Sequence, residues 1–523
     1  MAIGNSRTDE VQDTPTPVEQ SWAEFGFAPW VQPTYIALRR KTRDWMRPEV
    51  VLGLMILVYG IVFIRLTWLQ QSHYGTFDYD MGVFDQEIWL AAHHLNPFIT
   101  IRGLNMWANH VNPVIYLLVP FYWLGAGPHF LYIVQTLALA ASAIPLWLLA
   151  RDRFGNPWLA LGIPLAWLLY PAVEWMTKWP FQPEYLGVPA LLFAYWLADR
   201  GRWRWYGACV VFVLATKEDA ALPIIALGIL LAFRHHRRAG LLTMAGALAW
   251  FLVCIEVIMP SATPTAAPFF AYQFSSLGDS MGQILFNSVR HPSRILRLAF
   301  RHDRYQYYSQ LLVPVGGMAL LAPTTLFLAM PTLLVNVTDN QGYTHDIRFQ
   351  YGAFVAAGIF LAVIEAAGRL RHLGLRRLQI GLVCACALAS NVAWSPSRLN
   401  HQLFSSGIWI LTSDAQRNTL DQMVHMVPAG VGVSATYNVV PHLSHRDQIY
   451  TWPNPWIRSY YGTSATQPPE SPRSVQYVVL ATSNDVSLAD ELLLRRLTKP
   501  GGPFRIVLQE NEAVLAKRVR PGP

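Results

Sequence analysis

Long apolar runs alternate with short polar connections along most of the chain. The first apolar run, residues 50–69, has about the twenty residues that a helix needs to cross the hydrocarbon core of a bilayer. Ten further apolar stretches, several of them short, lie at residues 130–150, 157–172, 184–198, 205–216, 220–233, 239–259, 310–322, 323–337, 351–368 and 378–394. The pattern predicts a mainly α-helical, polytopic membrane protein with about 11 spans.

The composition supports this class. Hydrophobic residues make up 53% of the 523 residues and charged residues 14%, against about 25% charged residues in a typical soluble protein. A chain so poor in charge can be solvated only if lipid covers much of its surface. The four cysteines all lie in apolar runs and have neither a disulfide framework nor zinc-ligand spacing.

The basic residues predict one orientation in the membrane. The formal net charge is +8, and much of the excess clusters in alternate connections: Arg151 and Arg153; Arg200, Arg202 and Arg204; Arg234, Arg237 and Arg238; Arg369, Arg371, Arg376 and Arg377. With the basic N-terminal tail, these clusters fit a cytoplasmic N-terminus and an external C-terminus. The excess is therefore a topological signal, and we expect no nucleic-acid partner. Residues 310–337, bent at Pro323, are predicted as a hairpin of two short spans; a re-entrant loop would preserve the same orientation.

Three regions follow from this topology. Residues 1–47 form a polar cytoplasmic tail, residues 48–395 a transmembrane domain with outer loops 70–129 and 260–309, and residues 396–523 a small extracytoplasmic α/β domain. In the last region we predict helices at 419–426 and 488–497, strands at 431–435 and 477–481, and a terminal hairpin of 504–509 with 513–517. Its Pro-rich loop holds Trp452, Asn454, Trp456, Tyr460 and Tyr461, which either stack on sugar rings or pack the loop against the membrane domain.

Three carboxylates in the first outer loop are the strongest candidates for chemistry. Asp78, Asp80 and Asp85 lie within eight residues of one another. Carboxylates at a membrane rim are costly unless they are solvated or used, and here they can act as a general base or hold a divalent cation such as Mg²⁺ or Mn²⁺. We choose Asp80 as the base, with Asp85 or Asp78 orienting the acceptor or binding the cation. For Asp78 and Asp85, capping of the following surface helix is an equal alternative.

Several strings resemble one bacterial membrane family. They are Tyr79-Asp80-Met81-Gly82-Val83-Phe84-Asp85-Gln86, His110-x-Asn112-Pro113, Lys217-Glu218-Asp219, and Pro441-His442-Leu443-Ser444-His445-Arg446 followed by Ile449-Tyr450. Together they resemble the family catalogued as domain of unknown function 2079 over most of the chain. In Phe181-Gln182-Pro183-Glu184 the chain departs from the family, which usually has His before Pro-Glu. A catalytic or metal-binding role of that His would be weakened here.

The layout of that family is similar to the GT-C superfamily of membrane glycosyltransferases. This resemblance implies a polyprenyl-phosphate sugar as donor, an acidic motif in the first outer loop and an extracytoplasmic C-terminal domain. Asp80 matches the catalytic carboxylate of the superfamily in position. Because a fold does not fix a function, the site residues must carry the argument.

Further candidates lie at the predicted outer rim. Lys217 can bind the donor phosphate as a point charge, or form a salt bridge with Glu218, Asp219 or a first-loop carboxylate. His345 and Arg348 also lie at this rim, and we include Arg348 among the phosphate-binding residues. Other site candidates are His110, Glu184, Glu218, Asp219 and His345. Their spacing dictates no metal site.

A regular series of arginines follows the second long outer loop. Arg290, Arg294, Arg297, Arg301 and Arg304 are spaced 4, 3, 4 and 3 residues apart, which on one helix confines them to an arc of roughly 80°. Arg294, Arg297 and Arg301 are candidates for gripping a lipid-linked phosphate, since guanidinium matches phosphate oxygens. The alternative is an interfacial helix that rests on anionic headgroups.

Together these patterns predict a multi-pass glycosyltransferase of the bacterial inner (plasma) membrane. Its partners would be the lipid bilayer, a polyprenyl-phosphate-linked sugar, and an envelope glycan, lipid or protein acceptor. The alternatives are a lipid or glycan transporter or flippase, whose internal repeats we do not find, and a non-catalytic envelope-assembly protein. No G-x-S-x-G, Walker A, dinucleotide-binding or H-E-x-x-H motif occurs in the chain.

Overall fold

A computed structural model describes residues 47–234, 236–262, 273–397, 407–460, 471–482 and 487–520. The chain divides into two compact units, Met1–Leu54 and Met55–Pro523. The described part of the first unit is the beginning of helix α3 (Pro48–Ser72). Everything that follows concerns the second unit.

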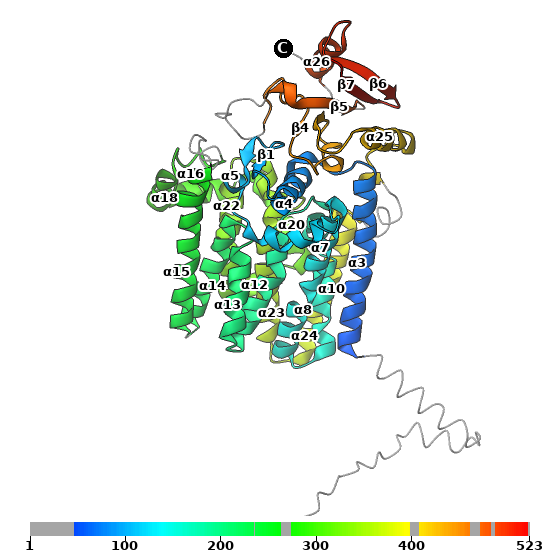
Figure 1. Ribbon diagram of the computed structural model, residues 1–523. Coiled ribbons are helices and arrows are strands. Elements are labelled where there is room, and N and C mark those ends of the chain that lie inside the picture. Colours follow the sequence, from blue (N-terminus) through cyan, green and yellow to red (C-terminus); the bar gives the residue numbers. More distant parts are fainter. Residues whose placement is uncertain are drawn as a thin grey trace, which may run out of the picture. The chain divides into compact units, whose positions relative to one another are not determined.

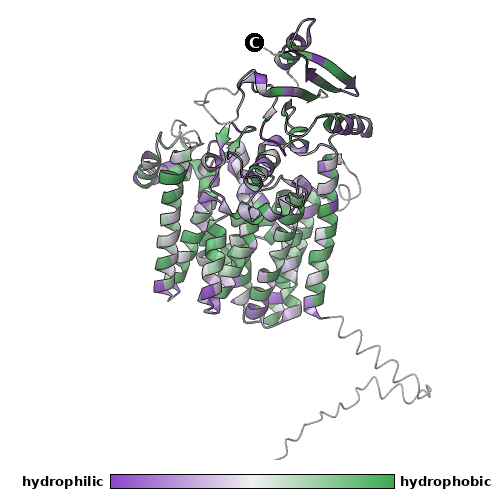
Figure 2. Cartoon of the chain, viewed as in Figure 1, coloured by the Kyte–Doolittle hydropathy of each residue, from purple (hydrophilic) through white to green (hydrophobic). Residues whose placement is uncertain are grey.

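Apolar helices of the second unit run side by side as a bundle, and Figure 2 shows that hydrophobic residues cover most of their length. The bundle comprises the rest of α3, α7 (Pro128–Ala141), α8 (Ala143–Phe154), α9 (Pro157–Ala160), α10 (Gly162–Leu168), α11 (Pro171–Lys178), α12 (Glu184–Asp199), α13 (Trp203–Leu214), α14 (Ala221–Phe233), α15 (Arg237–Val253), α23 (Ala353–Gly368) and α24 (Leu373–Trp394) (Figure 1). The mainly helical, membrane-protein-like fold is confirmed.

Among the described residues, 5 helical segments are long and apolar enough to cross a membrane: Pro48–Ser72, Pro128–Phe154, Arg237–Ala262, Gln350–Gly368 and Leu373–Trp394. The pair Pro157–Leu168 and Pro171–Lys178, bent by 50°, makes a sixth if it is one broken span. The remaining predicted spans are shorter helices, such as the 16 residues of α12 and the 13 of α14. The full number of about 11 stays a prediction.

Residues 310–337 form a chain of short helical pieces. These are the end of α20 (Tyr305–Leu312), 3₁₀ turns at Val313–Val315 and Met318–Leu321, α21 (Pro323–Leu326), a 3₁₀ turn at Phe327–Ala329, and α22 (Met330–Thr338). At its bend, Arg369 donates to the Leu321 carbonyl at 3.2 Å and Arg234 to Thr325 Oγ1 at 3.1 Å. The segment therefore turns at the end of the bundle that carries these two arginines, as a hairpin does.

The predicted cytoplasmic connections meet at that same end. Arg153 pairs with Asp199 at 2.7 Å and with Glu365 at 2.8 Å. Arg376 donates to the Phe154 carbonyl at 2.8 Å. These contacts join the ends of α8, α12, α23 and α24, so the basic residues close one face of the bundle.

Helices α14 and α15 pack backbone against backbone. A Cβ atom added to Gly240 would lie 2.5 Å from the Gly228 carbonyl oxygen, and one added to Gly228 would lie 2.8 Å from the Gly240 oxygen. Because only glycine permits this approach, the two residues set the spacing of the pair.

Short elements cover the opposite end of the bundle. The first outer loop contains a π-helical turn (Asp78–Gly82), α4 (Val83–Ala92), β1 (Phe98–Ile99), β2 (Leu104–Asn105), α5 (Met106–Asn109), a 3₁₀ helix (Pro113–Leu117) and α6 (Val119–Tyr122). The second outer loop and its approach contain a π-helical turn (Cys254–Ile258), α16 (Met259–Ala262), α18 (Met281–Arg290), α19 (Pro292–Ala299) and a 3₁₀ turn at His302–Arg304. Two further 3₁₀ turns, Gly342–His345 and Gln350–Gly352, lie between α22 and α23.

The prediction that the five arginines lie on one arc of a single helix is wrong. Helix α18 ends at Arg290 and α19 begins at Pro292, because proline lacks an N–H and disfavours helical geometry in the residue before it. Helix α19 ends at Ala299, so Arg301 and Arg304 lie beyond it. The Arg304 guanidinium is buried and donates to the Val337 and Asp339 carbonyls at 3.0 and 3.1 Å.

The C-terminal part contains a five-stranded sheet of order β4-β3-β5-β7-β6. Its elements are α25 (Asp414–Met426), β3 (Gly432–Ala435), β4 (Ile449–Thr451), β5 (Val475–Ala481), α26 (Leu488–Thr498), β6 (Phe504–Glu510) and β7 (Ala513–Arg518), with 3₁₀ turns at Gly407–Trp409, Val440–His442 and Pro472–Ser474. Strand β3 is parallel to β4 and β5, whereas β7 is antiparallel to β5 and β6. The predicted helices, strands and hairpin are all present, and β4 was not predicted.

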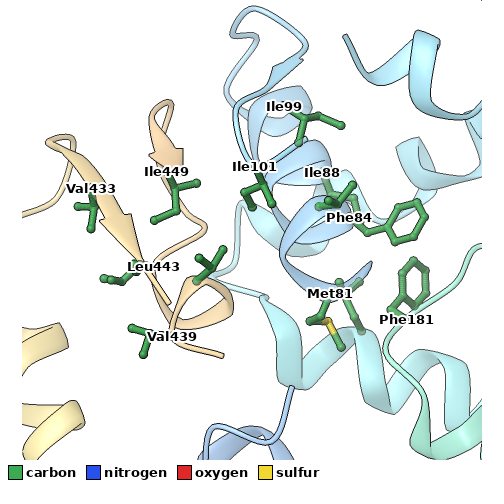
Figure 3. Packing of buried hydrophobic residues seen from close by; sticks show 14 of the residues in the cluster. Met81, Phe84, Ile88, Ile99, Ile101, Phe181, Val433, Val439, Leu443 and Ile449 are labelled. Atoms are coloured by element: carbon green, nitrogen blue, oxygen red, sulfur yellow. The ribbon is translucent and has the colours of Figure 1, made fainter. Parts of the chain in front are cut away.

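This sheet shares a hydrophobic core with the first outer loop. Met81, Phe84 and Ile88 of the loop belong to the same buried cluster as Val433 and Ile449 of the sheet (Figure 3). The core forms because the π-helical turn, which holds Met81, runs directly into α4, which holds Phe84 and Ile88, and the three residues follow at helical spacing. Loop and sheet therefore fold as one body over the bundle end.

Trp452, Trp456 and Asn454 of the Pro-rich loop make their described contacts within the C-terminal part, not with the membrane domain. Trp452 is buried and its ring centroid lies 5.5 Å from that of Trp456, which in turn contacts Phe504. Asn454 is buried and donates to the Thr451 and Ser459 carbonyls. Tyr461 lies outside the described residues.

Candidate functional site

Asp80 lies in the π-helical turn before α4, half-buried at the covered end of the bundle. The Trp179 indole donates to Asp80 Oδ2 at 2.9 Å. Burial raises the pKa of Asp80, and the Gln182 and Trp179 side chains and the charges of His110 and Lys217 offset part of this effect. Because its pKa is raised, the Asp80 carboxylate is suited to accept a proton.

Lys217 lies in a buried cluster of acidic side chains. Its Nζ is 3.5 Å from Glu184 Oε1, 3.5 Å from Asp219 Oδ2 and 5.7 Å from the centre of the Tyr351 ring. Burial alone would lower the pKa of Lys217, but the carboxylates of Asp219, Glu184 and Glu218 raise it well above its usual value. The lysine is therefore charged, and its two salt-bridge contacts are longer than the 2.7–2.9 Å typical of charge-assisted hydrogen bonds.

Glu218 connects this cluster to the first outer loop. His110 Nδ1 lies 2.9 Å from Glu218 Oε1, and the Val111 N–H donates to Oε2 at 3.0 Å. Burial would raise the pKa of Glu218, but the His110 and Lys217 charges and these hydrogen bonds lower it below its usual range. Glu218 is thus a fixed anion that holds His110 in place.

Two neighbouring buried side chains at the start of α12 have polar atoms that make no hydrogen bond with the described part of the chain. They are Glu184 Oε2 and Tyr185 OH. Buried polar groups normally have partners. Glu184 contacts Lys217, and Tyr185 interacts electrostatically with Asp80, so both side chains lie beside the charged residues of the site.

Asp85 and Asp78 belong to a different environment. Asp85 is fully buried and accepts from Tyr122 OH at 2.7 Å, from Ser444 Oγ at 2.6 Å and from His445 Nε2 at 3.1 Å. Asp78 accepts from the Thr451 hydroxyl, and burial raises its pKa to about 6. Both carboxylates face the C-terminal part, and α4 has no side-chain cap.

The other candidates are not joined to Asp80 by any contact among the described residues. Arg294 and Arg297 are exposed on α19, Arg301 pairs with Asp303 at 3.4 Å and Arg348 with Asp346 at 2.6 Å. His345 Nε2 lies 2.6 Å from Arg304 Nη1. The large apolar side chains Leu296 and Phe300 are exposed beside these arginines, an arrangement typical of an interfacial helix.

No three His, Cys, Asp or Glu side chains within the described ranges are grouped so that they could hold a metal ion. We therefore assign no step to Mg²⁺ or Mn²⁺, and a divalent cation stays a prediction.

The structure thus brings together Asp80, His110, Glu184, Lys217, Glu218 and Asp219; these six residues are called the Asp80 cluster. The sequence did not single out Trp179 or Tyr351 as parts of this cluster. Trp179 precedes a proline between two predicted spans, and that proline indicates a turn at the membrane rim. Nothing in this pattern indicates that Trp179 contacts Asp80.

A family model with the description "Predicted membrane protein (DUF2079)" matches residues 72–515. No curated protein matches the sequence. Among solved structures, ArnT from Cupriavidus metallidurans bound to undecaprenyl phosphate is similar, with 14% identity, a TM-score of 0.53, and coverage of 90% of this chain and 99% of that one. The apo structure of ArnT has 14% identity, a TM-score of 0.55, and coverage of 89% and 97%. Arabinofuranosyltransferase AftD from Mycobacteria has 12% identity, a TM-score of 0.46, and coverage of 90% of this chain and 40% of that one. The similarity to ArnT shows that the two chains share a fold.

Proposed function

Because the chain belongs to the DUF2079 family of membrane proteins and has a GT-C-like fold, we propose that it is a membrane glycosyltransferase. It would move a sugar from a polyprenyl-phosphate donor to a hydroxyl of an envelope glycan, lipid or protein. The reaction would take place at the outer face of the bacterial inner membrane. The observation that carries the proposal is the Asp80 cluster, where a carboxylate with a raised pKa faces a buried, charged lysine.

In the proposed reaction the acceptor oxygen attacks the anomeric carbon of the donor sugar. The bond between that carbon and the phosphate oxygen breaks, and polyprenyl phosphate leaves with the electron pair. The hydroxyl proton passes to Asp80, which acts as general base. Negative charge collects on the departing phosphate, so a fixed cation beside it stabilises the transition state.

Lys217 is the residue that we assign to that phosphate. Its ammonium has two long contacts of 3.5 Å, and its three N–H donors leave capacity for a phosphate oxygen. Glu184 and Tyr185 supply further polar atoms for the sugar hydroxyls. The fold similarity to ArnT, which was solved with undecaprenyl phosphate, supports a lipid phosphate as the donor class.

The proposal is tested by measuring release of polyprenyl phosphate from a panel of polyprenyl-phosphate sugars, with an envelope extract as acceptor. We expect Asp80→Asn to lower the rate by about 10²–10⁴-fold, the usual contribution of a general base. Lys217→Met should also lower it strongly. The matched controls are Asp279→Asn and Lys499→Met, because both residues are exposed and lie outside the Asp80 cluster.

If the Asp80→Asn variant still releases polyprenyl phosphate, the protein is a glycosyltransferase but Asp80 is not its general base. No release from any donor by a folded protein would instead favour a transporter or an envelope-assembly protein. Addition of EDTA to the wild-type reaction would show separately whether a divalent cation is required.

A further inference from the structure

A cavity of about 550 Å³ lies on the other side of the first outer loop from the Asp80 cluster. Its walls come from the outer end of α3, the start of α7 and the segment after β3 that contains residues 441–445. This volume is within the range of small-ligand sites in proteins. The residues that line it do not include Asp80 or Lys217.

One wall of the cavity carries a buried carboxylate–imidazole pair. Asp85 lies behind His445, and the hydroxyls of Tyr122 and Ser444 fix the carboxylate. Because an ionised carboxylate only accepts, His445 donates through Nε2. The Nδ1 atom of the ring is left as a further hydrogen-bonding atom, and the His445 side chain, which lines the cavity, is 40% exposed.

A second polar group faces the same space. Gln71 is 1% exposed and its Nε2 lies 3.3 Å from His442 Nε2, whereas its Oε1 has no hydrogen-bond partner among the described residues. Burial lowers the pKa of His442 to about 3, so this ring is neutral and accepts from the Gln71 amide. The amide is therefore held in one orientation beside the cavity.

The rest of the wall combines aromatic side chains with small and aliphatic residues. Trp68 is 50% exposed, and its ring centroid lies 4.1 Å from that of His129. None of the lining residues is Lys, Arg, Asp or Glu. A phosphate or other anion would find no Lys or Arg here and would meet the Asp85 carboxylate behind His445, whereas an exposed indole beside fixed hydrogen-bonding groups suits a sugar ring.

We propose that this cavity binds an uncharged sugar, with the ring stacked on Trp68 and a hydroxyl bonded to His445. Binding of the sugar stands on the cavity alone. Its identification as the acceptor of glycosyl transfer rests on the proposed function. The lipid phosphate of the donor would then bind beside Lys217, and the neutral glycan acceptor would bind beside His445.

The test uses the full chain in phosphatidylcholine nanodiscs and two photoreactive probes with the same alkyl chain. One probe is an alkyl glucoside with a diazirine on the sugar; the other is an alkyl phosphate with a diazirine next to the phosphate. Labelled peptides are identified by mass spectrometry. We expect the glucoside to label residues 125–133 and 441–445, and the phosphate to label residues 179–185 and 215–219.

Trp68→Leu and His445→Gln should each lower glucoside labelling of the cavity by about tenfold, the loss of one aromatic or polar contact. The matched control is Trp158→Leu, since Trp158 is 46% exposed but does not line the cavity. Because Trp68 is half-exposed, its replacement leaves the fold intact, so a negative result with this variant counts against the proposal.

Glucoside labelling that is spread over the protein or unaffected by Trp68→Leu would overturn the proposal. So would phosphate labelling of the cavity that equals the glucoside labelling. If cavity labelling holds but the Asp80→Asn assay shows no enzyme, the sugar site stands and only the acceptor assignment falls.

Discussion

Asp80 and Asp85 lie five residues apart in one helical segment, yet the structure gives them opposite environments. Asp80 is half-buried, accepts one indole hydrogen bond and faces a cluster of charged residues. Asp85 is fully buried and accepts from two hydroxyls and an imidazole. The Asp80 carboxylate can therefore accept a proton from a substrate, whereas the Asp85 carboxylate is occupied by hydrogen bonds from its neighbours. The environment rather than the residue type separates a candidate base from a positioning group.

The largest expected contrast is in local stability. Asp85→Ala would leave the Tyr122 and Ser444 hydroxyls and His445 without their shared acceptor, at a cost of about 2–4 kcal/mol. Asp80→Ala removes one described hydrogen bond and should cost about 1 kcal/mol. Hydrogen exchange of the amides in residues 432–451 measures both, because Asp85 joins the loop to this segment. Equal losses in the two variants would break the comparison.

A smaller effect is expected from pH. Burial lowers the pKa of His445, but Asp85 raises it, and the net result lies above the usual value of about 6.5. A group whose folded pKa is raised stabilises fully below its unfolded pKa, and the contribution is lost as pH rises through the folded pKa. Exchange protection of residues 440–449, corrected for intrinsic rates, should therefore fall as pH rises above about 6.5.

His445→Gln should remove this dependence on pH. Asp78 also makes stability fall as pH rises, but over a lower pH range, because burial raises its pKa to about 6. Its contribution to stability is lost between about pH 4 and pH 6. Asp78→Asn therefore serves as the control that leaves the step above pH 6.5 in place. A step that persists in His445→Gln would mean that another group causes it.

The smallest effect is expected at the exposed arginines. Replacing Arg294, Arg297 and Arg301 together by Gln should leave polyprenyl-phosphate affinity within about twofold, since none of them contacts the Asp80 cluster and an exposed charge contributes little. Binding of a radiolabelled polyprenyl phosphate provides the measurement. A tenfold or larger loss of affinity for polyprenyl phosphate would show that these arginines bind the donor and would contradict the assignment of the phosphate to Lys217.

Much of the fold could be predicted because apolar runs and alternating basic connections report directly on membrane crossing. The small sheet was also predictable, since the run Tyr477–Ala481 and the turn at Asn511 and Glu512 have local signals. The three-residue strand β4 has no such signal and exists through its pairing with β3. The arginine series misled because a regular spacing says nothing about the helix break that Pro292 imposes.

The site was predictable only in part. Asp80 and Lys217 stand out because charge at a membrane rim needs a reason. The partners of Asp85 could not be found in this way, because Ser444 and His445 lie about 360 residues further along the chain. Nothing local in either sequence segment indicates that they meet, and the pairing depends on the whole bundle bringing the two segments together.

The shared core of loop and sheet has a consequence for biosynthesis. Phe84 leaves the ribosome early, but Val433 and the strands that complete its core follow roughly 350 residues later. At typical elongation rates of about 5–20 residues per second, the apolar face of α4 waits for roughly 20–70 s before the rest of its core is synthesised. During that interval lipid or a chaperone must cover Met81, Phe84 and Ile88. The outer end of the protein is therefore assembled last, and a chain that stops before β3 would expose the same face permanently.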